Sequence, residues 1–170
     1  KDYEVIDCSA GEKLERWSKY ILLRPDPQVI WKPTIDMSAY KGLDAKYTRS
    51  ESGGGKWQYF GKVPDEWTIS YDDLTFKIKP MGFKHTGLFP EQAVNWDIMR
   101  GLIKNAGRPV SVLNLFAYTG GATVACLNAG ASVCHVDAAK GMVERAGENV
   151  RLSGLSDKPV RFIVDDCKKF

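Results

Sequence analysis

The stretch "LNLFAYTGG", Leu113 to Gly121, decides the fold that we expect for this chain. A short apolar run leads into a Tyr-Thr-Gly-Gly turn, and helical and strand-like patterns alternate on both sides of it. Strands that are apolar on both faces and alternate with helices predict a parallel sheet covered by helices. The expected order is a helix over 90–107, a strand over 109–117, a helix over 121–130, a strand over 131–137, a helix over 140–154 and a strand over 159–166.

The helix expected over 90–107 has recognisable ends and one apolar side. Pro90 suits the first turn of a helix, and Gly107 closes the pattern. The apolar residues recur at helical spacing, which predicts one packed face. That stripe consists of Val94, Ile98 and Leu102, together with Met99, Ile103 and Ala106.

The first 81 residues have a different rhythm and predict a small α+β module. "GEKLERWSKY", residues 11–20, predicts a short helix with Leu14 and Trp17 on one side. "KYILLRPDPQVIW" predicts a strand that its prolines end. Two short strands are expected around the glycines at 53–55, and "WTISYDDLTFKIK" predicts a hairpin that turns at Asp72-Asp73. We therefore divide the chain into an N-terminal module, 1–81, and a second domain, 82–170.

Composition excludes some classes of protein and leaves others open. The chain has 170 residues, of which 44% are hydrophobic and 26% charged, and its net charge is +3. Basic and acidic residues are mixed, so nucleic-acid binding cannot be argued from charge. No apolar run approaches the roughly 18 residues of a membrane span, and the first residues are too polar for a signal peptide. We expect a cytoplasmic protein.

The four cysteines match no common zinc spacing and form no C-x-x-C pair, so no metal site is predicted. The simplest interpretation is reduced structural thiols in a cytoplasmic protein, and a redox pair is the alternative. They are Cys8, Cys126, Cys134 and Cys167.

A nucleotide-like ligand is expected at the carboxyl ends of the predicted strands, beside the glycine turn. Gly120 and Gly121 allow a tight turn and a close approach of the backbone to a ligand. Asp137 follows Gly120 at a spacing close to the roughly 20 residues that are expected before a carboxylate that binds a ribose hydroxyl pair. Asp165-Asp166 ends the third strand, where a carboxylate can accept from an adenine amino group. The alternatives are an ordinary glycine turn and aspartates that only cap helices.

The glycine turn narrows the choice of cofactor. A dinucleotide site would show G-x-G-x-x-G, and a P-loop would show G-K-[ST], but this turn matches neither pattern. S-adenosylmethionine has no phosphate, so its site needs room and polar contacts rather than an anion cradle. The sequence therefore favours S-adenosylmethionine.

Three stretches then carry a family resemblance: "GFKHTGLFPEQAVNWD", "VLNLFAYTGGATVACLNAGASVCHVDAAKGMVERAGENVRLSGL" and "FIVDDC". Together they resemble class I S-adenosylmethionine-dependent methyltransferases, in the branch related to bacterial 23S ribosomal-RNA methyltransferases that modify cytosine C5 or guanine N2. The resemblance covers Gly82 to Phe170. It implies a Rossmann-like domain, S-adenosylmethionine as cofactor, and an RNA base as methyl acceptor.

The resemblance also assigns cofactor contacts. It implies that the methionine side of the cofactor is lined by Phe116, Tyr118, Thr119, Gly120 and Gly121. It implies that Asp137 holds the ribose, with Ala138 beside the adenine. It also implies that Asp166 contacts the adenine amino group, with Asp165 as second choice. "KHTGLFPEQ" matches a cofactor-touching segment of the branch, which adds Thr86, Gly87, Phe89 and Gln92. His85 interrupts that pattern, so Lys84 and His85 are not assigned. The alternative for "FPEQ" is a simple helix start.

The same resemblance implies parts that the sequence does not contain. Class I folds usually continue beyond a third strand, and no Asp-Pro-Pro-type motif is present. We therefore expect a domain truncated after its third strand, inactive alone, with its catalytic residues beyond Phe170. Cys167 is expected at the cofactor end rather than as a nucleophile. An exposed sheet edge could support a homodimer.

Alternative functions remain open at this point. A methyltransferase could act on a small molecule or a protein instead of RNA. A non-catalytic nucleotide- or RNA-binding module could use aromatic residues such as Trp57 and Tyr59 to stack bases. A nucleotide-dependent oxidoreductase is disfavoured by the missing glycine fingerprint.

Overall fold

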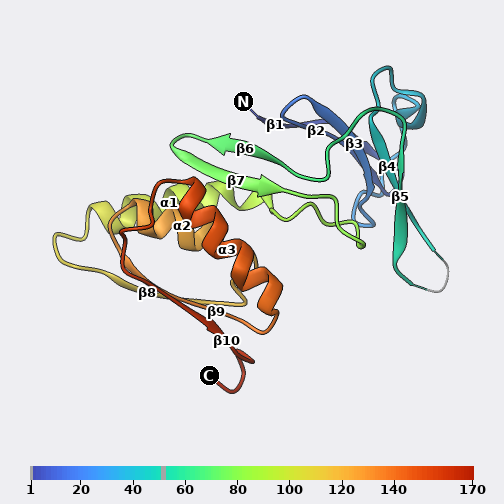
Figure 1. Cartoon of the computed structure of the whole chain (residues 1–170). Helices are drawn as coiled ribbons and strands as arrows, with labels where there is room; N and C mark the ends of the chain where they lie inside the picture. Colours follow the sequence, from blue (N-terminus) through green and yellow to red (C-terminus); the bar gives the residue numbers. More distant parts are fainter. Residues whose placement is uncertain (1, 51–52) are drawn as a thin grey trace. The chain divides into compact units, whose positions relative to one another are not determined.

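The computed structural model describes residues 2–50 and 53–170, which form two compact units (Figure 1). Unit 1 comprises Lys1–Tyr71 and Ile78–Gly87, and unit 2 comprises Asp72–Lys77 and Leu88–Phe170. The units interleave along the chain, because a short segment between the two parts of unit 1 belongs to unit 2. The division into domains at residue 81 stays a prediction.

Unit 1 is built on a five-stranded sheet in the order β1-β2-β3-β4-β5. β3 and β4 are parallel, and the other neighbours are antiparallel. Leu14, Leu23 and Met37 form a buried cluster against it. The elements are β1 (Tyr3–Ser9), β2 (Glu12–Trp17), β3 (Tyr20–Pro25), the 3-10 helix η1 (Met37–Ala39), β4 (Ala45–Arg49) and β5 (Gly55–Tyr59). The expected strand in 19–31 is confirmed over Tyr20–Pro25, where the prolines end it, and the two strands around 53–55 are confirmed.

The helix predicted over residues 11–20 is wrong, because this stretch forms β2. Positive φ angles at Gly11 (78°) and Ser18 (59°) place a tight turn at each end of the strand. Glu15, fully buried, pairs across β2 and β3 with Arg24, whose Nε donates to Glu15 Oε2 at 2.6 Å. A buried carboxylate needs such a partner, and the sheet supplies it.

The predicted hairpin at 67–79 is confirmed as a two-stranded sheet of β6 (Trp67–Tyr71) and β7 (Leu74–Ile78). Asp72 has a φ of 50° at the turn between them. The boundary between the units passes through this hairpin, so that most of β7 belongs to unit 2.

Unit 2 has the alternating order that the sequence predicts. Its sheet is parallel throughout, with the strand order β10-β9-β8, and α1, α2 and α3 all lie on one side of it (Figure 1). The elements are η2 (Pro90–Gln92), α1 (Ala93–Lys104), β8 (Ser111–Leu115), α2 (Gly121–Asn128), β9 (Ser132–Asp137), α3 (Lys140–Leu152) and β10 (Val160–Val164). This is a mixed α/β fold.

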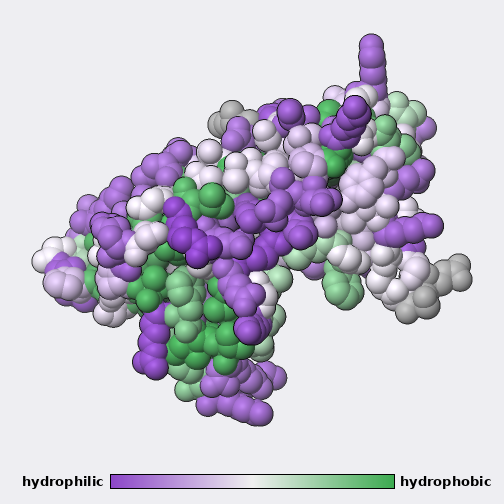
Figure 2. Space-filling view, in the orientation of Figure 1, coloured by the Kyte–Doolittle hydropathy of each residue, from purple (hydrophilic) through white to green (hydrophobic). Residues whose placement is uncertain are grey.

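The two faces of this sheet differ. His135 on β9 is fully buried, whereas Leu113 and Leu115 on β8 are exposed. The sequence predicted helices over a sheet that is apolar on both faces, but the three α-helices of the described residues cover only one. Figure 2 shows hydrophobic residues gathered at the surface over these strands.

The packed face of α1 agrees with half of the predicted stripe, since Met99, Ile103 and Ala106 are half-buried. Val94, Ile98 and Leu102 are 67%, 56% and 69% exposed. Trp96, which lies outside the predicted stripe, is 3% exposed and packs against Phe76 with ring centroids 5.1 Å apart. The helix is therefore rotated, relative to the prediction, so that Trp96 points inward.

Candidate cofactor site

The turn between β8 and α2 carries unusual backbone angles. Phe116, Tyr118 and Gly120 have φ values of 53°, 52° and 82°. Only glycine adopts this region freely, and a bulky residue there costs about 1–3 kcal/mol. Two aromatic residues held this way mark a turn whose shape is imposed by its surroundings.

Hydrogen bonds donated by backbone N–H groups hold that turn. The N–H of Tyr118 donates to Asp137 Oδ2 at 2.9 Å, and the N–H of Phe116 donates to Cys167 Sγ at 3.1 Å. Within and beneath the turn, the N–H of Gly120 donates to the Ala117 carbonyl at 3.0 Å and that of Ala117 to the Val136 carbonyl at 3.1 Å. Residues at the ends of β9 and β10 thus offset the backbone strain.

A cavity of about 250 Å³ opens beside this turn, within unit 2. This volume is smaller than the roughly 300–1,000 Å³ of a typical ligand pocket, so the cavity can take part of a nucleoside cofactor. Apolar and aromatic walls surround a few polar groups. The lining residues are Leu88, Phe89, Gln92, Trp96, Met99, Asn114, Phe116, Ala117, Tyr118, Thr119, Gly121 and Ala122.

The cavity brings together half of the predicted cofactor residues. Phe89 packs on Tyr118 with ring centroids 5.1 Å apart, which joins the segment before α1 to the glycine turn. Gly120 does not line the cavity. The predicted residues that line it are Phe89, Gln92, Phe116, Tyr118, Thr119 and Gly121.

The two glycines are required by close packing rather than only by backbone angle. A Cβ on Gly120 would lie 2.9 Å from the Cβ of Ala146, and one on Gly121 would lie 2.7 Å from Cζ2 of Trp96. Both distances are below normal van der Waals contact. The turn therefore lies directly on α1 and α3.

Asp137 lies at the end of β9 beside the turn but does not line the cavity. Its Oδ2 accepts from Tyr118 and its Oδ1 accepts from the N–H of Ala139 at 2.9 Å. Each carboxylate oxygen keeps a further lone pair, so two ribose hydroxyls could still bind. Ala138, the neighbour assigned to the adenine, also lies outside the cavity lining.

The aspartates after β10 lie at the same edge of the sheet. Asp165 donates its N–H to the Asp137 carbonyl at 3.1 Å, and Asp166 Oδ1 accepts from the N–H of Lys168 at 3.0 Å. Both side chains are exposed, and neither lines the cavity. Cys167 contacts the glycine turn, which places it at the expected end of the sheet.

The remaining predicted contacts belong to unit 1, whereas the cavity lies within unit 2. Thr86 is fully buried, and its Oγ1 has no hydrogen-bond partner among the described residues. Burial lowers the pKa of Lys84, whose Nζ donates to the Pro25 carbonyl, and burial together with Arg24 lowers the pKa of His85. Roles for Thr86 and Gly87 in cofactor binding stay predictions.

Sequence reasoning missed several lining residues, of which Asn114 had a visible signal. It is a polar residue inside the apolar run of β8. Its Nδ2 donates to Thr123 Oγ1 at 2.9 Å, and that oxygen lies 2.9 Å from His135 Nδ1. The other missed residues are Leu88, Trp96, Met99, Ala117 and Ala122.

His135 completes this buried polar chain beneath the turn. Burial lowers its pKa, and Asp137 and the Tyr118 backbone oppose that shift only in part. A neutral imidazole is therefore favoured at neutral pH. Its Nε2 is buried without a hydrogen-bond partner within residues 2–50 and 53–170.

Other kinds of site find no support in the described part of the chain. It holds no group of three or more His, Cys, Asp or Glu residues arranged to bind a metal ion. None of its helices is long and apolar enough to cross a membrane. The four cysteines are free thiols.

The parallel βαβαβ unit and its strained glycine turn form a mixed α/β fold, which matches known structures of S-adenosylmethionine-dependent methyltransferases. The chain belongs to the S-adenosylmethionine-dependent methyltransferase family, whose model matches residues 21–169. The cofactor of this family is S-adenosylmethionine, as the sequence predicted. The family resemblance that the sequence motifs carry is thereby confirmed.

Individual relatives agree with this family. The chain is 39% identical over 126 residues to the ribosomal RNA large subunit methyltransferase K/L of Shewanella frigidimarina, an alignment that covers 74% of this chain and 17% of that protein. It matches a crystal structure of the S-adenosylmethionine-dependent methyltransferase from Agrobacterium tumefaciens with a TM-score of 0.92 and 37% identity, over 100% of this chain and 54% of that one. The chain thus spans only part of each relative.

A more distant structure shares the fold alone. SMU.776, a candidate methyltransferase solved in complex with S-adenosylhomocysteine, has a TM-score of 0.75 and 17% identity, over 99% of this chain and 46% of that one.

Proposed function

We propose that this chain binds S-adenosylmethionine at the carboxyl edge of the β8–β10 sheet, and that the methyl acceptor is a base in ribosomal RNA. The strained turn over 116–121 carries the cofactor assignment, because it opens onto a cavity and is held by the carboxylate assigned to the ribose. The name of the Shewanella relative supports the acceptor.

In this proposal, the cavity receives the amino-acid end of the cofactor. Its size suits part of the molecule, and Gln92, Asn114 and Thr119 supply polar groups among its walls. The ribose would lie against Asp137, and the adenine beyond it near Ala138 and Asp166. The order of these residues along the sheet edge matches the order of groups in the cofactor.

The chemistry assigns these residues a positioning role. S-adenosylmethionine supplies a methyl group on a positively charged sulfur, and the reaction is an in-line displacement. The contribution of the site is to hold the donor in one orientation against the acceptor. We assign no catalytic residue within residues 1–170.

Calorimetric titration tests the cofactor part of the proposal. S-adenosylmethionine and S-adenosylhomocysteine should bind the chain, and NAD should not. An Asp137→Ala variant should weaken both interactions, whereas Asp157→Ala, which changes an exposed aspartate in the turn after α3, should not. Binding of NAD alone would contradict the assignment.

A transfer assay tests the acceptor. Since the chain alone is expected to be inactive, a longer protein that contains it, matched in length to the relatives, is incubated with S-adenosylmethionine carrying a labelled methyl group and with ribosomal RNA lacking modifications. Label should enter the RNA, and nuclease digestion should release it as a methylated nucleoside. Label found only in protein or small molecules would replace RNA with another acceptor class.

A further inference from the structure

Side chains of α3 and of Ser153, the residue that follows it, take the place of a strand partner for β7. Asn149 Oδ1 accepts from the N–H of Lys77 at 2.8 Å. One helical turn later, Ser153 Oγ accepts from the N–H of Thr75 at 2.9 Å and donates to the Thr75 carbonyl at 3.0 Å. Four helical residues and two strand residues each advance by about 6–7 Å, so the two spacings match.

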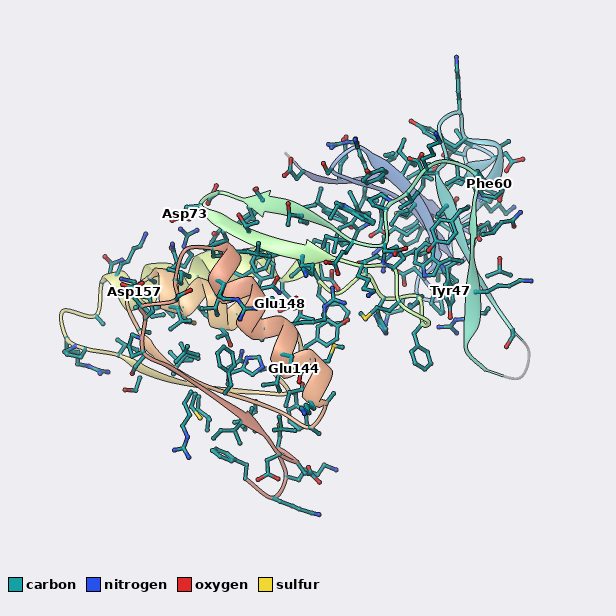
Figure 3. The ribbon with its side chains drawn as sticks, viewed as in Figure 1. Tyr47, Phe60, Asp73, Glu144, Glu148 and Asp157 are labelled. Carbon is teal, nitrogen blue, oxygen red and sulfur yellow. The ribbon has the colours of Figure 1, made fainter. Side chains whose placement is uncertain are left out.

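The segment Asp72–Lys77 is also fixed at its ends by charged and amide side chains of the helices of unit 2. Asp73 accepts from Arg100 on α1 at 2.7 Å and from Asn128 on α2 at 2.7 Å. Lys77 pairs with Glu148 on α3 at 3.0 Å. Figure 3 labels Asp73 at the tip of the hairpin and Glu148 on α3. The segment Asp72–Lys77 is therefore held by side chains from α1, α2 and α3.

Asn149 reaches the cofactor turn with its other end. Its Nδ2 donates to the Thr119 carbonyl at 2.8 Å. The same peptide group donates through the N–H of Gly120 to the Ala117 carbonyl. Because a peptide group is planar, these two bonds fix the plane of the Thr119–Gly120 peptide at both ends.

Burial makes this arrangement hard to replace. Asn149 is fully buried and Thr119 is 1% exposed, so water cannot substitute for a lost partner. The N–H of Lys77 can donate only to the oxygen of the Asn149 amide, which leaves the nitrogen facing Thr119. β7 thus sets the orientation of the side chain that holds the turn.

We infer that Asn149 is a positioning residue of the cofactor site, which transmits the placement of β7 to the Thr119–Gly120 peptide. This inference rests on the proposed function, because it requires S-adenosylmethionine to bind at the 116–121 turn. Ser153 provides the contrast, because among the described residues its hydroxyl bonds Thr75 of the same strand and not the turn.

Two variants separate positioning from simple support of the fold. In Asn149→Asp, the ionised carboxylate can still accept from Lys77 but cannot donate to Thr119. We expect affinity for S-adenosylhomocysteine at pH 8 to fall about tenfold or more, in line with a buried carbonyl left unpaired. Ser153→Ala should lower thermal stability but leave the affinity within about twofold of the unchanged chain, since it spares the turn.

A pH series adds a measurement of affinity that would not change with pH in the expected way if Asn149 only supported the fold. As the pH falls from 8 to 5, the introduced carboxyl becomes protonated and can donate to the Thr119 carbonyl, so the affinity of Asn149→Asp should approach that of the unchanged chain. The unchanged chain, measured over the same series, accounts for the other groups. Those on α2, α3, β7 and β9 are Lys77, Cys126, Cys134, His135, Asp137, Lys140, Glu144, Arg145, Glu148 and Arg151.

The outcomes are distinct. If the unchanged chain does not bind S-adenosylhomocysteine, the proposed function fails. If it binds and Asn149→Asp binds equally well at pH 8, or if the loss is equal in Ser153→Ala and is not recovered at pH 5, the positioning role is wrong. Should Asn149→Asp be unfolded by circular dichroism, Asn149→Ser is measured instead, and an affinity unchanged from that of the original chain overturns the inference.

Discussion

At the scale of single residues, the shape of the site depends on glycine positions, where no side chain prevents close packing. The turn bends through Phe116 and Tyr118 at a cost in strain, and Gly121 lets it rest on the ring of Trp96. Asp137 offsets part of that cost through the N–H of Tyr118. The cofactor turn is therefore stabilised from neighbouring elements more than by its own sequence.

Gly121→Ala should disturb this packing, because the added Cβ would lie 2.7 Å from the Trp96 ring. We expect the free energy of unfolding to fall by about 1–3 kcal/mol. Gly101→Ala is the control, since a Cβ there meets nothing within 4 Å inside α1. Alanine in a helix interior should be neutral or stabilise by up to about 1 kcal/mol. Urea unfolding followed by tryptophan fluorescence measures both, and equal effects would contradict the packing argument.

At the scale of elements, sequence patterns predicted the helices and strands whose formation depends on neighbouring residues in the chain. The alternating apolar strands and helices around 113–121 gave the parallel unit correctly, as did the hairpin at Asp72-Asp73. The stretch 11–20 was misread because Leu14 and Trp17 suit either a helix or a strand. The strand pairs with β1 and β3 on its two sides, and the partner of its buried Glu15 is Arg24 on the next strand, so its own residues do not show the pairing. Asn149 was likewise invisible, since its partners lie 30 and 72 residues away.

The orientation of α1 gives a prediction for a whole element. Val94→Gln, Ile98→Gln and Leu102→Gln should each change the free energy of unfolding by no more than about 0.5 kcal/mol, because these side chains are exposed. Trp96→Ala should cost about 3–5 kcal/mol, because it empties a buried site. Denaturant unfolding of the four variants tests this rotation. Large losses in the three glutamine variants would restore the face expected from sequence.

At the scale of the whole molecule, the two histidines, one in each unit, make stability depend on pH. Burial lowers the pKa of both His85 and His135 below the value of about 6.5 for an unfolded chain. Below that pH, the unfolded chain binds more protons than the folded chain does. The free energy of unfolding is therefore full above about pH 6.5 and falls as the pH drops through it.

The loss should not exceed about 1.4 kcal/mol per pH unit for each histidine. Urea unfolding at intervals between pH 8 and pH 5 measures the slope. A variant with His85→Gln and His135→Gln should lose most of it, whatever its absolute stability. Asp26 and Asp73, whose pKa values are lowered chiefly by hydrogen bonds from Lys13 and from Asn128, should contribute only at more acidic pH. An unchanged slope in the double variant would show that other groups dominate.

The interleaving of the units has a consequence for synthesis on the ribosome. The N–H of Lys77 can form its hydrogen bond only after Asn149 has been translated, 72 residues later. At about 5–20 residues per second, that delay is on the order of 4 to 14 s. Throughout it, the nascent β7 carries Leu74 and Phe76, both fully buried in the finished protein. Phe76 also emerges before its packing partner Trp96 on α1. Nascent chains should therefore engage a chaperone until α3 has emerged, and only then become resistant to protease around residues 72–77.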